Sequence, residues 1–165
     1  MRQRVLSLLV ENTAGVLSRV AGLFSRRGYN IDSLTVGETR DPKYSRMTVA
    51  LRGDDQIITQ IRAQLLKLED VISVDELIDG ESVCRELVLV KLMADKQQKQ
   101  DIIAIADVFR AKIVDVGLSS IMVELTGNTN KINAFLTLLD DYVIKQIVRT
   151  GLTGLTRGNF DVTEE

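Results

Sequence analysis

Residues 48–66 read TVALRGDDQIITQIRAQLL, and residues 122–140 read MVELTGNTNKINAFLTLLD. Aligned without gaps, the two stretches share apolar and glycine positions: Val49 and Val123, Leu51 and Leu125, Gly53 and Gly127, Ile58 and Ile132, Ile61 and Phe135, and Leu65 and Leu139. In each stretch an alternating strand pattern runs through a glycine turn into a helix with one apolar face. Asp54 and Asn128 stand where a helix N-cap is expected, because their side chains can accept hydrogen bonds from free amides. The sequence therefore predicts a repeated structural unit.

The first half of the chain extends this unit in both directions. Apolar spacing predicts strands over residues 3–10, 29–38, 44–52 and 71–78, and helices over residues 15–27 and 57–68. Gly28 closes the first helix, since glycine tolerates the left-handed turn common at helix ends. Pro42 marks a turn between two strands that form a hairpin. The predicted order is βαββαβ.

The second half begins the same order again after a polar break near residues 79–82. Strands are predicted over residues 85–93, 112–116 and 120–126, and a helix over residues 102–110, with the repeated helix after Asn128. Units of this kind are typical of ferredoxin-like folds, in which helices cover one face of an antiparallel sheet. We therefore predict an α+β protein with two ferredoxin-like domains, residues 1–79 and 80–165.

Composition narrows the kinds of partner. The chain has 165 residues, 45% of them apolar, and its 21 basic and 23 acidic residues give a net charge of −2. Charge of both signs is spread along the chain, so neither nucleic acid nor an anionic membrane is an expected partner. The opening residues MRQRVLSLLVEN hold too short an apolar run for a membrane span or a signal peptide. With one cysteine, Cys84, no internal disulfide can form, and a cytoplasmic protein is expected.

The chain contains no histidine, and this restricts the possible chemistry more than any motif does. Nucleophile pairs that depend on imidazole and the usual zinc sites built from His and Cys are excluded. Acidic pairs occur at four places, Asp54-Asp55, Glu69-Asp70, Asp75-Glu76 and Asp140-Asp141. They stand at predicted turns and helix ends, where capping is the plainer interpretation. We therefore expect no catalytic residues, no metal site and no cofactor.

One turn has a second interpretation, the stretch between the first strand and the first helix. It consists of Asn12, Thr13, Ala14, Gly15, Val16 and Leu17. On local chemistry alone, Asn12 or Thr13 is a helix cap. The free amides at a helix N-terminus can also receive a carboxylate, and Gly15 would let a ligand approach the backbone. Such a contact contributes about 0.3 to 1 kcal/mol at an exposed end, so selective binding needs further groups.

A family resemblance favours the second interpretation. Residues 8–49, LLVENTAGVLSRVAGLFSRRGYNIDSLTVGETRDPKYSRMTV, resemble the N-terminal ACT domain of the small, regulatory subunit of acetohydroxyacid synthase, also called acetolactate synthase. LVLVKL, FRAKIVDVG and TGLTGLTRG in the second half are similar to that family's C-terminal, ACT-like domain. The resemblance implies a non-catalytic subunit that binds the thiamine-diphosphate-dependent catalytic subunit, which forms acetolactate from pyruvate. It also implies activation of that subunit and feedback inhibition by valine in branched-chain amino acid biosynthesis.

The resemblance also implies where the effector binds, at the interface between two ACT domains of a homodimer. The loop after the first strand of one subunit, Asn12 to Leu17, meets the start of the second strand of the other, Asn30 and Ile31. In this arrangement backbone amides near Gly15 receive the carboxylate, the two asparagines bind the polar end, and Val16 and Ile31 contact the branched side chain. Without the resemblance, Asn30 would be interpreted as a polar residue at a strand edge.

Other interpretations stay open at this point. The chain could be a freestanding ACT-domain amino-acid sensor or a transcriptional regulator, although its charge and the lack of a helix-turn-helix segment disfavour DNA binding. An independent carboxylate-based enzyme is a third class. The turn at residues 95–100, DKQQKQ, has no glycine, so a ligand cradle there is expected to be absent or different. The glycine-rich residues 151–158 lack a phosphate-loop lysine and are expected to be mobile or to dock a partner.

Overall fold

A computed structural model describes residues 2–158 of the chain. The chain divides into two compact units: the first extends to Cys84 and also includes the segment that begins at Gly151, and the second is Arg85–Thr150. The α+β class with two βαββαβ units is confirmed. Each unit is described separately below.

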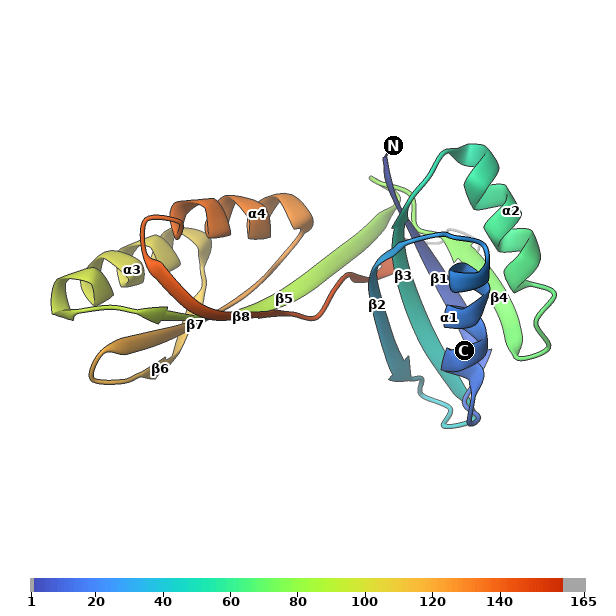
Figure 1. The fold of residues 1–165 in the computed structure, drawn as a ribbon, viewed down its shortest axis with the longest axis horizontal. Coiled ribbons are helices and arrows are strands. Elements are labelled where there is room, and N and C mark those ends of the chain that lie inside the picture. Colours follow the sequence, from blue (N-terminus) through green and yellow to red (C-terminus); the bar gives the residue numbers. More distant parts are fainter. Residues whose placement is uncertain (1, 159–165) are drawn as a thin grey trace. The chain divides into compact units, whose positions relative to one another are not determined.

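The first unit has the predicted elements with small changes at their ends. They are β1 (Gln3–Glu11), α1 (Val16–Arg26), β2 (Ile31–Glu38), β3 (Tyr44–Arg52), α2 (Asp55–Leu65) and β4 (Val71–Glu76). The strands form an antiparallel sheet in the order β2-β3-β1-β4, so β2 and β4 are its edges. Figure 1 shows α1 and α2 on the same face of this sheet.

Alternation along the central strands gives this sheet one face for the helices. The core of the first unit is formed by alternate residues of β1 and β3 and by one side of each helix. These residues are Leu6, Leu8 and Val10 of β1, Met47, Val49 and Leu51 of β3, Val16, Val20, Leu23 and Phe24 of α1, and Ile58, Ile61 and Leu65 of α2. The helices bury apolar residues at three- and four-residue spacing, which places them on one side of each helix. Gly28, with φ of 70°, makes the predicted left-handed turn after α1.

The second unit repeats this architecture. Its elements are β5 (Ser82–Met93), which begins in the first unit, α3 (Lys96–Phe109), β6 (Lys112–Val116), β7 (Ser120–Gly127), α4 (Thr129–Leu138) and β8 (Val143–Arg149). The strand order β6-β7-β5-β8 corresponds to that of the first sheet. Phe135 of α4 and Phe109 of α3 meet edge to face, with ring centroids 5.3 Å apart, in a core that also contains Val88, Val90 and Leu92 of β5. The repeat that the sequence predicts is therefore a structural repeat.

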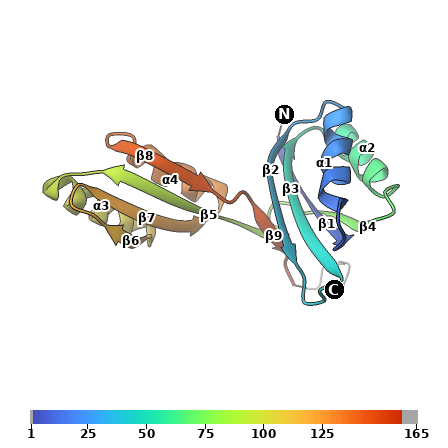
Figure 2. The same cartoon turned by 60° about the horizontal axis from the view of Figure 1, so that its bottom comes forward.

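The glycine-rich segment after Thr150 differs from the expectation. Residues Thr153–Thr156 form a strand, β9, which pairs with β5, and Leu152 is only 6% exposed. Figure 2 shows β9 on the side of the first sheet that faces away from α1 and α2. Residues 151–158 therefore pack with the first unit, whereas the predicted division assigned them to the domain 80–165; residues 159–165 of that domain lie outside the described residues.

Candidate functional site

The helix that follows the Asn12–Leu17 loop begins without a side-chain cap. Its N-cap residue is Gly15, which has φ of 88° and ψ of −8° and makes no side-chain hydrogen bond to the first turn. The prediction that Asn12 or Thr13 caps this helix is therefore wrong. Because the left-handed conformation is unfavourable for residues with a Cβ, Gly15 is required by the backbone itself. Val16 N donates to Thr13 O at 3.4 Å, and no side chain caps the amides that follow it in the first turn of α1.

The other three helices of the described chain close their own N-termini. Asp54 accepts from Ile57 N at 2.9 Å, and Asn128 accepts from Lys131 N at 2.9 Å, as the sequence predicts. At α3, Asp95 accepts from Gln98 N at 2.8 Å, while the Gln98 side chain accepts from Asp95 N at 3.0 Å. This reciprocal capping box binds the backbone amides of Asp95 and Gln98 within the chain. In this respect the start of α3 differs from the start of α1.

Asn12 is held by the turn between β2 and β3 and not by the helix. Its backbone N–H donates to Lys43 O at 2.8 Å, and its side-chain amide nitrogen donates to Pro42 O at 3.0 Å. The same nitrogen lies 3.5 Å from Glu38 Oε2 at the end of β2. Because both neighbours are acceptors, the nitrogen must face them, and the side-chain oxygen is the end that can accept a hydrogen bond from a ligand.

Arg19 lies over the glycine. A Cβ atom added to Gly15 would stand 2.9 Å from Nη1 of Arg19, and Arg19 Nε donates to Asp70 Oδ2 at 2.5 Å. Asp70 precedes β4, and its backbone carbonyl accepts from Glu11 N at 2.9 Å. This ion pair joins the first turn of α1 to the ends of β1 and β4. It places a guanidinium beside the loop.

The side chains of the loop differ in their accessibility. Thr13 and Ala14 are exposed, and Leu17 is 47% exposed. Val16 is only 3% exposed, because its side chain packs in the core of the first unit. The Val16 side chain therefore has little surface to offer a ligand in this chain, and its backbone N–H donates to Thr13 O at 3.4 Å. Leu17 has the exposed apolar surface next to it.

Asn30 and Ile31 lie at the opposite end of the sheet from this loop. Ile31 pairs with Leu51 of β3, and Leu51 pairs with Arg4 of β1. The loop begins after Glu11, seven residues further along β1 than Arg4. At about 3.3 Å per strand residue, the two parts of the predicted site are separated by roughly 23 Å within one chain. One chain alone therefore does not bring them together.

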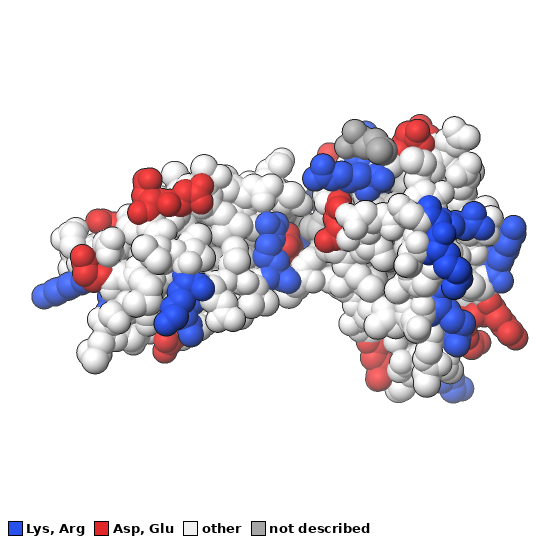
Figure 3. Space-filling model, viewed as in Figure 1, with Lys and Arg blue, Asp and Glu red and all other residues white. Residues whose placement is uncertain are grey.

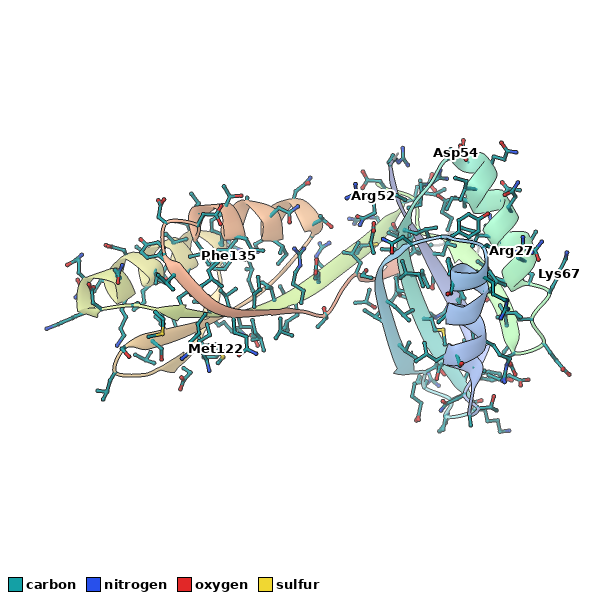
Figure 4. The ribbon with its side chains drawn as sticks, viewed as in Figure 1. Arg27, Arg52, Asp54, Lys67, Met122 and Phe135 are labelled. Carbon is teal, nitrogen blue, oxygen red and sulfur yellow. The ribbon has the colours of Figure 1, made fainter. Side chains whose placement is uncertain are left out.

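Charged side chains lie along the end of the first sheet at which β2 starts. Arg4 donates to Glu76 at 2.6 Å and to Asp55 at 2.7 Å, and its hydrogen bonds with Asp55 and then Glu76 raise the pKa of its guanidinium. Arg52 pairs with Asp32 at 3.4 Å. Figure 4 shows Arg52 and Asp54 at this same end of the first sheet. Figure 3 shows basic and acidic side chains on the same face of the first unit, so neither sign dominates the view.

Sequence reasoning missed one group of residues near β2. The Ser33 Oγ accepts from Leu152 N at 3.3 Å, and the Thr35 hydroxyl donates to Leu152 O at 3.2 Å. These contacts connect residues more than a hundred positions apart, which no local pattern encodes. The local signal for this group is the pair of glycines, Gly151 and Gly154, in the stretch that the sequence predicts to be mobile or to dock a partner.

Among residues 2–158, no three His, Cys, Asp or Glu side chains gather where they could hold a metal ion. Over the same residues, none of the helices has the length and apolar character needed to cross a membrane.

Comparison with known proteins identifies both units. The family described as "AHAS small subunit-like ACT domain" matches residues 6–73, and the family described as "Small subunit of acetolactate synthase" matches residues 85–158. The probable acetolactate synthase small subunit of Methanothermobacter thermautotrophicus is 48% identical over 156 residues, which cover 94% of this chain and 93% of that protein. The acetolactate synthase isozyme 3 small subunit of Escherichia coli is 46% identical over 158 residues, covering 95% and 97% of the two chains.

A solved structure gives the same result. The crystal structure of the acetolactate synthase small subunit from Thermotoga maritima superposes with a TM-score of 0.90 at 40% identity, covering 97% of this chain and all of that one. The fold is thus that of a protein with an N-terminal ACT domain followed by a second domain of the same architecture. The chain belongs to the acetolactate synthase small subunit family.

Proposed function

We propose that this chain is the regulatory subunit of an acetolactate synthase. It binds the thiamine-diphosphate-dependent catalytic subunit, raises the rate at which that subunit forms acetolactate, and makes it sensitive to feedback inhibition by valine. The observation that carries the proposal is the 48% identity to a named small subunit over 94% of the chain. The first unit, including the ACT domain, then holds the effector and the dimer contact.

The effector site requires two copies of the chain. The loop at Asn12–Leu17 and the start of β2 lie about 23 Å apart in one chain. β2 is an edge strand, so its outer backbone groups are available to pair with another strand. If β2 pairs antiparallel with the same strand of a second copy, the start of one strand lies beside the end of the other. Because Asn12 lies next to Glu38 at the end of β2, this pairing brings Asn30 of the partner subunit toward Asn12.

A free branched-chain amino acid fits the groups that would meet there. Its carboxylate would accept hydrogen bonds from the first-turn amides of α1 that follow Val16, which no side chain caps. Its ammonium would donate to the free side-chain oxygen of Asn12 and to Asn30 of the partner subunit. Its branched side chain would contact Leu17 and Ile31 of the partner subunit. Thr13 and Ala14 complete the loop that positions these groups.

Regulation follows only if valine distinguishes two arrangements of the assembled enzyme. A ligand that binds the inhibited and the active arrangements equally well changes neither population. A site shared by two copies can make this distinction, because a small change in how the copies pair alters contacts on both sides of the ligand. Typical coupling factors for such effects are about 5- to 150-fold.

Two experiments test the proposal. Calorimetry with valine, isoleucine, leucine and lysine should show binding of valine or a related branched-chain amino acid and none of lysine. Asn12→Ala and Gly15→Asp should abolish that binding. Gly28→Asp is the matched control, because Gly28 also has positive φ, with nothing within 4 Å of an added Cβ, and lies at the other end of α1.

The second experiment is reconstitution with a catalytic subunit. Adding the chain should raise acetolactate formation, and valine should lower it again. Valine binding without any activation would favour a freestanding amino-acid sensor. Activation without binding of any branched-chain amino acid would refute the effector site and leave the subunit role in place.

A further inference from the structure

A short segment of the chain, residues 149–152, is fixed at every position. Arg149 donates to both carboxylate oxygens of Glu86, at 2.6 and 2.8 Å, and Glu86 is only 6% exposed. Thr150 N donates to Leu87 O at 3.0 Å, and Leu87 N donates to the Thr150 hydroxyl oxygen at 3.1 Å. These bonds lie within the second unit. The last two residues of the second unit, Arg149 and Thr150, are therefore both held by hydrogen bonds to β5.

The next two residues are fixed within the first unit. Leu152 N and O are both bound by side chains of β2, from Ser33 and Thr35. Gly151 has φ of 86°, and a Cβ added to it would stand 2.8 Å from Ser33 Cβ. This distance is shorter than real Cβ contacts, and its partner atom cannot move without moving β2. Gly151 is therefore required both by its conformation and by its approach to Ser33.

Ser33 is held on the sheet face opposite the helices. Ser33 pairs with Ala50 of β3 and Thr35 pairs with Thr48, and both β3 residues alternate with the residues of the helix-side core. We use the name strap for Gly151–Thr156, which contacts this face. Gly154 of the strap lies close to the start of β5, since a Cβ added to it would stand 2.8 Å from Val83 O and 2.6 Å from Cys84 Sγ.

A β-bulge separates the strap contact from the proposed effector residues. The register between β2 and β3 shifts between Ile31 and Ser33, which leaves Asp32 as the extra residue. A bulge is a local break in the ladder where the strand can bend. Asn30 and Ile31 thus lie on one side of the bulge, and Ser33 lies immediately on the other side. A ligand that moves the first pair acts on the residue that holds the strap.

We infer that the strap is the relay by which an effector bound at the start of β2 acts on the second unit. The inference rests on the proposed function and identifies Ser33 and Gly151 as positioning residues for the response to valine. Movement at Asn30 and Ile31 bends β2 at Asp32 and shifts Ser33. Gly151 and Leu152 contact β2, whereas Arg149 and Thr150 are bound to β5. A shift of Ser33 therefore reaches the end of β8 through Leu152 and Gly151.

The test compares variants in the holoenzyme reconstituted with a catalytic subunit. Gly151→Ala should displace the strap, and Ser33→Ala should loosen it by about fivefold, the effect of one neutral hydrogen bond. Both variants should bind valine within about twofold of the wild type and should still activate, while the valine concentration for half inhibition rises about fivefold or more. Gly80→Ala is the matched control, because Gly80 has φ of 84° and nothing lies within 4 Å of its added Cβ.

A second readout follows the relay directly. In the wild-type chain, valine should change amide hydrogen exchange at Thr150–Leu152 as well as at the proposed binding residues, and Ser33→Ala should remove the change at Thr150–Leu152 alone. The inference is refuted if both variants are inhibited like the wild type, or if inhibition and valine binding weaken in parallel. If the wild-type chain neither binds valine nor is inhibited by it, the proposed function is refuted. That outcome differs from the one that supports the relay, in which the variants lose inhibition but still bind valine.

Discussion

Replacing Leu152 with alanine should destabilise the first unit, although Leu152 follows the last strand of the second. The Leu152 side chain is 6% exposed, and its backbone N and O are held by Ser33 and Thr35. Buried Leu→Ala substitutions cost about 2 to 5 kcal/mol in the free energy of unfolding. Leu152 lies on the sheet face opposite the helices and outside the main core of the first unit, so we expect about 2 kcal/mol, near the lower limit of that range.

The assay must separate the two units. Urea unfolding followed by hydrogen exchange would assign the loss, and protection should fall at Thr35 and Thr48 while amides of β7 stay unchanged. For a unit of this size, about 2 kcal/mol corresponds to a fall in Tm of about 8 °C or more. Leu155→Ala is the matched control, since Leu155 lies in the same strap but is 66% exposed, and its loss should cost less than about 0.5 kcal/mol.

The result that would refute this reasoning is a loss of protection in β7 with β2 and β3 unchanged. Residues after Thr150 would then stabilise the second unit, as the predicted division at residue 80 implied. Equal effects of the Leu152 and Leu155 substitutions would also refute it, because burial would then not determine the cost. Either outcome would remove the physical basis of the strap.

Three further predictions concern the second unit. Arg149→Ala should lower the free energy of unfolding by about 3 kcal/mol, because it leaves the buried Glu86 carboxylate without its partner. The double variant Arg149→Met with Glu86→Leu should recover most of that loss. Urea unfolding would measure both. Hydrogen bonding to Glu86 raises the pKa of Arg149. The stabilisation from this pair is therefore fully present below the unfolded-state pKa and is lost only as pH rises through the higher folded-state pKa. Free energies of unfolding measured from about pH 6 to about pH 9 should show no loss from this pair. Phe135→Ala should cost about 3 to 5 kcal/mol and Phe135→Leu less, since Phe135 is fully buried against Phe109; an equal cost would contradict the packing argument, and thermal unfolding would measure it.

The features that the sequence predicts well are those encoded by neighbouring residues. The strand and helix around Gly53 and those around Gly127 follow from apolar spacing, and the caps Asp54 and Asn128 follow from residue type. Each of these features depends on contacts within about one turn or one hairpin. Two copies of one pattern then define the fold class without any knowledge of contacts between distant residues.

The features that the sequence does not predict depend on contacts between distant residues. Asn12 has the residue type of a helix cap, but the turn at Pro42 competes for its side chain and Gly15 takes the cap position. The glycine-rich segment from Gly151 has the composition of a tail, but Ser33 binds it from the other end of the chain. In each case a hydrogen-bonding group that looks free in the sequence is satisfied by a remote partner.

The separation of the two parts of the proposed effector site has a thermodynamic consequence. Because neither the Asn12–Leu17 loop nor the Asn30–Ile31 edge holds a complete set of ligand contacts, a ligand that uses both stabilises the pair of chains by mass action. Ligand binding and chain pairing are then thermodynamically coupled. A change at the bulge beside Asn30 and Ile31 would also move Ser33, which follows the bulge on the same strand. In the proposed arrangement these properties depend on two features of the first unit: α1 has no side-chain cap, and β2 is an edge strand. The second unit closes its corresponding helix with Asp95 and Gln98, so the repeated fold keeps the architecture but already uses the backbone N–H groups of these two residues within the chain.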